Sequence, residues 1–122
     1  MQNPNGLIIS GASDASGNTT SSAISTSQWV ASTFMAYFSE NTAAGTLQLQ
    51  FSNDPPSGIP NNDFTPTNWM NVPGSQATAT VSSGGSVVVY PPAYFVCRWL
   101  RVVFTRSGGA GTFSVAYNAL FP

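Results

Sequence analysis

The chain has 122 residues, 42% of them hydrophobic, with three basic and four acidic side chains, one cysteine, and neither histidine nor lysine. A chain of this length makes one domain with one core, and the missing residue types exclude an imidazole base, the usual catalytic triad, a Schiff-base lysine and the common zinc sites. Three arginines are too few for the basic field that binds nucleic acid, and no apolar run approaches the roughly 18 residues of a membrane-spanning helix, so we expect no enzyme, no cofactor, no nucleic acid and no membrane partner.

The first residues, 1–21, are rich in Ser, Asn, Gly and Thr, and we predict that they form an N-terminal arm or edge segment ahead of a domain over residues 22–122. Alternation of apolar and polar residues is typical of strands with one buried face. The segment 29–39 carries apolar residues on both faces, which indicates a central strand or a strand buried between the sheet and a neighbouring chain. Strong strand signals lie at 29–39, 47–52, 77–81, 87–90, 99–104 and 113–118, and weaker ones at 7–10, 22–27 and 69–72.

Turn-forming residues separate these strands. Glycine-rich pairs and runs occur at 17–18, 43–45, 84–85 and 108–111, and glycine supplies the positive φ of tight hairpins. About eight short strands must close two sheets over one core. We therefore predict an all-β fold: a single-domain antiparallel β-sandwich, jelly-roll-like.

A proline-rich loop at residues 53–68 interrupts the strands and contains Pro55, Pro56, Pro60 and Pro66. Proline cannot donate to a ladder, so this density excludes regular pairing and stiffens the segment. Ile59 and Phe64 in the loop, and Trp69 just after it, predict that it packs against the sandwich or a partner chain. We expect the N-terminal arm and this loop to make contacts between subunits.

The carboxylates at this loop have two interpretations. Asp54 and Asp63, with the asparagines beside them, offer the oxygen ligands that calcium takes. The same residue types cap turns through hydrogen bonds to nearby backbone. Because the spacing matches no known calcium loop, we favour turn capping and expect no metal.

The arginines and the cysteine offer little chemistry of their own. Arg98, Arg101 and Arg106 flank or interrupt one strand without forming a single basic stripe, and we interpret them as partners of carboxylates or carbonyls at an interface. Cys97 has no histidine to activate it and is expected to pack as a small hydrophobe.

The tryptophans and tyrosines again allow two interpretations. Trp29, Trp69, Trp99, Tyr90 and Tyr94 could form an aromatic platform for sugar rings, as in some small β-sandwich domains. They could instead fill the core or an interface. We favour this second interpretation because the chain has few leucines to fill a core.

Several stretches resemble small virion proteins of tailed bacteriophages. These are Ser27-Gln28-Trp29-Val30, the segment 45–55 (GTLQLQFSNDP), Asn68-Trp69, the segment 97–104 (CRWLRVVF) and the segment 111–115 (GTFSV). Together they are similar to the phage head decoration or cement proteins, over most of residues 22–119. The resemblance implies a β-sandwich on the capsid exterior that bridges neighbouring major capsid subunits, as a dimer or trimer, and it brings no catalytic residues.

We therefore predict a structural virion protein of a tailed bacteriophage that decorates the outer capsid surface and stabilises contacts between major capsid subunits. Its partners are the major capsid protein and itself, and it is made in the host cytoplasm without a signal peptide. The candidate interface residues are Ile59, Phe64, Trp69, Tyr94, Arg98 and Arg101.

Two alternatives remain. A carbohydrate-binding or host-adhesion module of a head or tail fibre would use Trp69 or Tyr94 as a stacking surface. A major coat protein of a small virus ranks last, because packaging nucleic acid requires a basic arm or face that this chain lacks.

Overall fold

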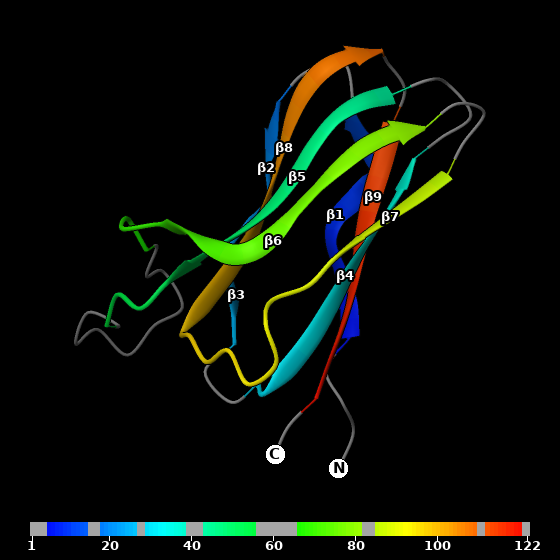
Figure 1. Ribbon diagram of the computed structural model, residues 1–122. Coiled ribbons are helices and arrows are strands. Elements are labelled where there is room, and N and C mark those ends of the chain that lie inside the picture. The colour runs from blue at the N-terminus through cyan, green and yellow to red at the C-terminus, as the bar shows by residue number, and fades with distance from the viewer. Residues whose placement is uncertain are drawn as a thin grey trace.

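The computed structural model describes residues 5–14, 18–26, 29–38, 43–55, 66–81, 85–109 and 112–120. Within these ranges the protein is all-β, with nine strands and no helix, and the strands form two antiparallel sheets that face each other (Figure 1). The predicted β-sandwich is confirmed. No helix in the described part of the chain has the length and apolar character needed to cross a membrane.

The first sheet has four strands. Their order across the sheet is β1 (Asn5–Asp14), β9 (Thr112–Leu120), β4 (Ala31–Phe38) and β7 (Gly85–Val89). Strand β4 lies between β9 and β7, which confirms the central strand predicted from its two apolar faces. Its residues Phe34, Ala36 and Phe38 are buried, whereas Tyr37 is exposed.

The second sheet has five strands. Their order is β2 (Thr19–Thr20), β8 (Trp99–Gly109), β5 (Ala43–Ser52) and β6 (Met70–Val81), with β3 (Ile24–Ser25) also pairing with β8. The alternation in β5 sets its two faces: Leu47 and Leu49 are fully buried, and Gln48 and Gln50 point to the outer side.

Consecutive strands mostly lie in opposite sheets. The steps β1 to β2, β3 to β4, β4 to β5, β6 to β7, β7 to β8 and β8 to β9 all change sheet, while β2 to β3 and β5 to β6 do not. As a result each sheet is assembled from strands far apart in the sequence, such as β1 and β9.

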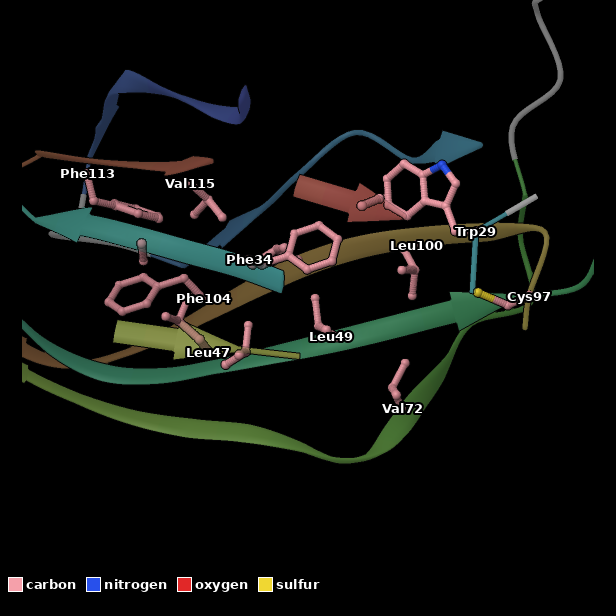
Figure 2. Packing of buried hydrophobic residues seen from close by; sticks show 14 of the residues in the cluster. Trp29, Phe34, Leu47, Leu49, Val72, Cys97, Leu100, Phe104, Phe113 and Val115 are labelled. Carbon is pink, nitrogen blue, oxygen red and sulfur yellow. The ribbon is translucent and has the colours of Figure 1, made fainter. Parts of the chain in front are cut away.

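The core fills the space between the sheets (Figure 2). Phe34, Phe113 and Val115 of the first sheet face Leu47, Leu49, Leu100 and Phe104 of the second. The ring centroids of Phe104 and Phe113 are 5.0 Å apart, within the range of favourable aromatic contact. Each such fully buried side chain contributes roughly 1.5–3 kcal/mol through burial of apolar surface.

Trp29 and Cys97 close one end of this core (Figure 2). Trp29 stacks on Tyr117 with ring centroids 5.5 Å apart. Cys97 is a free buried cysteine whose Sγ lies 3.3 Å from the hydroxyl of Thr26. Burial raises the pKa of the Cys97 thiol. Both residues therefore serve packing, as predicted for Cys97.

Strand β6 differs from its prediction. The sequence indicates two separate strands at 69–72 and 77–81, but the structure has one strand with a bulge over residues 72–75, opposite the step from Gln48 to Gln50. Ser75, which is buried, donates to the carbonyl of Val72 at 2.8 Å and accepts from Gln48 Nε2 at 2.8 Å. These bonds replace ladder bonds lost at the bulge, so the strand continues beyond it.

Residues 5–14, which include the weak strand signal at 7–10, form edge strand β1 of the first sheet. Two other segments differ from expectation. The weak strand predicted at 22–27 is limited to Ile24–Ser25. Strand β8 continues to Gly109, into the glycine run predicted as a turn.

Candidate functional site

A row of polar side chains crosses the outer face of the five-stranded sheet. Gln50 of β5 is in register with Asn71 of β6 on one side and with Arg101 of β8 on the other. Arg101 Nε donates to Gln50 Oε1 at 2.8 Å, and Gln50 Nε2 donates to Asn71 Oδ1 at 3.0 Å. The three side chains form a continuous hydrogen-bonded row because their strands share one register.

Trp69, which directly precedes β6, supports the arginine of this row. The guanidinium carbon of Arg101 lies 4.2 Å from the centroid of the Trp69 ring, a cation–π arrangement. The indole of Trp69 is fixed in turn by a hydrogen bond from Nε1 to the carbonyl of Pro66 at 3.1 Å. Partial burial lowers the pKa of Arg101 from its ordinary value, but the group remains a cation at neutral pH.

Asp54 joins the two ends of the proline-rich loop beside Trp69. Its carboxylate accepts from the backbone amides of Thr67 and Asn68 at 2.8 and 3.0 Å, and from Asn68 Nδ2 at 2.8 Å. These hydrogen bonds, that of the Asn68 side chain first, hold the pKa of Asp54 below its ordinary value of 3.8. Asp54 binds backbone amides, as the favoured interpretation held, but these amides lie 13 and 14 residues further along the chain and not in a local turn.

The same corner receives the beginning of β8. Trp99 Nε1 donates to the carbonyl of Asp54 at 3.2 Å, and the amide of Arg98 donates to Asn53 Oδ1 at 3.0 Å. The loop end at 53–55 is therefore attached to the sheet at several points. This attachment positions the Trp69–Arg101 pair although the pair lies next to a loop.

The structure brings together some of the predicted interface residues. Trp69 and Arg101 are in direct contact, and Arg98 lies at the same corner through Asn53. Tyr94 lies elsewhere, on the connection from β7 to β8; it is 80% exposed, and its amide donates to Val30. Ile59, Phe64 and Asp63 lie outside the described residues.

Gln50 and Asn71 complete the site but were not singled out from the sequence. The alternating pattern places Gln50 on the outer face, yet nothing in the sequence indicates that it faces Arg101. The arrangement can hold a planar polar group by hydrogen bonding and stacking. In the described part of the chain there is no cluster of three or more His, Cys, Asp or Glu that could hold a metal ion.

The Trp69–Arg101 corner is carried by a fold with a counterpart among solved structures. The crystal structure of PBSX exported protein XepA matches with a TM-score of 0.53 and 14% sequence identity. The match covers 98% of this chain and 37% of that chain, so this chain spans little more than a third of the length of that protein. At this identity the similarity shows a shared fold. No protein-family model and no curated protein matches the chain.

Proposed function

We propose that this chain is a structural virion protein of a tailed bacteriophage, without enzymatic activity, that binds the outer capsid surface and stabilises contacts between major capsid subunits. The observation that carries the proposal is the match of nearly the whole chain to the PBSX exported protein XepA. Fold similarity alone does not transfer function, so the chemistry of the surface has to agree with this role.

The surface chemistry supports association. The chain has a formal net charge of −1 and only 6% charged residues, so repulsion between copies is weak. Several large apolar side chains are exposed, namely Tyr37, Met70, Val88, Tyr90, Tyr94, Val96 and Leu120. A lattice or an oligomer would cover such side chains, and repeated weak contacts hold a protein on a lattice through avidity.

The strand order also supports a structural virion protein. If β2 and β3 are taken as one interrupted strand, the sheets have the orders β1-β9-β4-β7 and β2/β3-β8-β5-β6. We interpret this alternation between two four-stranded layers as a jelly roll, an architecture found in viral capsid and lectin domains. Dimers or trimers on the capsid exterior would use the exposed apolar residues as contacts.

The test is the copy number of this chain in gradient-purified particles, measured by quantitative mass spectrometry against the major capsid protein. A stoichiometry similar to that of the capsid protein is expected for decoration. A copy number lower by an order of magnitude would place the chain on a fibre or tail. Absence from particles would overturn the proposal.

A second candidate is a carbohydrate-binding or host-adhesion module, favoured by the 80% exposure of Tyr94. An open tyrosine ring is a surface on which a sugar can stack, whereas Arg101 covers one face of Trp69. Binding on a glycan array that is lost in Tyr94→Ala and kept in Trp69→Ala would support this candidate. Flat arrays would exclude it.

A further inference from the structure

Arg101 is held in one orientation before any partner arrives. Gln50 fixes its Nε, and the Trp69 ring supports the flat guanidinium. A free arginine side chain has about 2 kcal/mol of rotamer entropy to lose, so an ordered one forms new hydrogen bonds at lower entropic cost. The two terminal nitrogens, Nη1 and Nη2, donate to no atom of the described residues.

The other two arginines show that this arrangement is specific to Arg101. Arg106 uses its guanidinium within its own strand, with Nε and Nη2 donating to the carbonyl of Gly109 at 3.0 and 2.8 Å. Arg98 is exposed, and its described hydrogen bonds involve its backbone alone: the amide donates to Asn53 Oδ1 and the carbonyl accepts from the amide of Thr26. Only Arg101 combines a fixed guanidinium, partial burial and a terminal edge without a described acceptor.

We propose that the Nη edge of Arg101, supported by Trp69 and Gln50, binds a carboxylate of an acidic side chain on the major capsid protein. This inference rests on the proposed function and names the group that the binding surface recognises. A carboxylate matches the edge because its two oxygens accept two parallel N–H bonds from Nη1 and Nη2. The described partners of the guanidinium, Gln50 and Trp69, are neutral, so its positive charge has no opposite charge among them. A bound anion would supply that charge.

An acidic protein side chain fits the surroundings better than a free anion. Arginine and tryptophan are enriched among the residues that dominate binding energy at protein interfaces, and a polar rim surrounds them there. Here the neighbours of Arg101 on the sheet face are Gln50 and Asn71, both uncharged. With so little charge elsewhere on the chain, one oriented ion pair can define the register of binding.

The test uses capsids that lack this protein and measures binding of the purified full-length chain by co-sedimentation. Arg101→Gln should weaken binding about 10- to 100-fold, the loss expected when hydrogen bonds to a charged group are removed. Arg101→Lys keeps the charge but loses the planar edge, and should recover only a small part of the affinity. Arg106→Gln, at an exposed arginine outside the candidate interface, is the matched control and should bind as the wild type does.

The outcomes separate this inference from the proposed function. If the wild type does not bind capsids, the proposed function fails. If the wild type binds and Arg101→Gln binds equally well, or if Arg106→Gln is weakened as much as Arg101→Gln, the carboxylate site fails while the function stands. Arg101-dependent binding to a uronic-acid polysaccharide but not to capsids would assign the carboxylate to a glycan and overturn the inference.

A final control concerns the carboxylates of the chain itself. Asp63→Asn alone, in a chain that keeps Arg101, should leave thermal stability and capsid binding unchanged. Strong coupling between Asp63→Asn and Arg101→Gln in a double-mutant cycle of stability would show that the partner carboxylate belongs to this chain, and would overturn the inference.

Discussion

Gly45 lies at a point of close approach between β5 and β8. It shares the inward orientation of Leu47, and the ring of Phe104 occupies the space where a side chain would be. A Cβ at this position would lie 2.7 and 2.8 Å from two ring carbons of Phe104 and would overlap the carbonyl oxygen of Thr105. We predict that Gly45→Ala destabilises the fold.

The expected loss follows from these contacts. Overpacking a core costs about 1–3 kcal/mol. The upper end applies here because the clash involves the backbone carbonyl of Thr105, and Thr105 cannot shift without disturbing its pairing with Thr46. The lower conformational entropy of the unfolded alanine variant offsets about 0.4–1 kcal/mol. The net loss is about 2 kcal/mol, which lowers Tm by about 10 °C for a domain of this size.

Gly108→Ala is the matched control because Gly108 pairs with Ala44 at the same end of the two strands. A Cβ on Gly108 would meet no atom within 4 Å, so its Tm should stay equal or rise slightly. Both variants are measured by thermal unfolding followed by circular dichroism. A Tm for Gly45→Ala at or above that of Gly108→Ala would refute the reasoning, as would the absence of coupling between Gly45→Ala and Phe104→Leu.

Three further predictions concern single side chains. Because the pKa of Asp54 is lowered in the folded protein, its carboxylate stabilises the fold above pH 3.8, and the Tm of the wild type should exceed that of Asp54→Asn at neutral pH. This difference in Tm should shrink as the pH falls below 3.8, and a difference that persists in acid would contradict the prediction. Cys97 is buried with a raised pKa, so iodoacetamide at pH 8 should leave it unmodified in the folded protein and alkylate it in denaturant; rapid labelling of the folded protein would show that the site is open. Ser75→Ala should lower the free energy of unfolding by about 1–3 kcal/mol, because the Gln48 amide and the Val72 carbonyl lose a buried partner, and chemical denaturation measures this; a neutral result would mean that water replaces the hydroxyl.

The fold class could be predicted because side-chain alternation survives in the sequence wherever a strand has one buried face. Leu47 and Leu49 with Gln48 between them already define the faces of β5. The continuity of β6 could not be predicted, because Pro73 and Gly74 look like a strand end. One of the bonds that repair the bulge comes from Gln48 on another strand, and local pattern carries no information about it.

The candidate site, too, could be predicted only in part from the sequence. Trp69 and Arg101 each stood out as residue types suited to an interface, but their contact depends on two strand registers, β5 with β6 and β5 with β8. Register is determined by the complete sandwich and its turns, so a single sequence leaves it open. Gln50, which links the two registers, was for that reason the part of the site that sequence reasoning missed.

The pairing of β1 with β9 has a consequence for how such a domain can be combined with others. Asn5 and Asn118 are direct partners across the ladder, so the chain enters and leaves the sandwich at neighbouring points. A unit with adjacent entry and exit can be inserted into a surface loop of another protein without forcing the two sides of that loop apart. The same geometry makes the domain suitable for circular permutation, with a short linker between the present ends and new ends opened at an exposed turn.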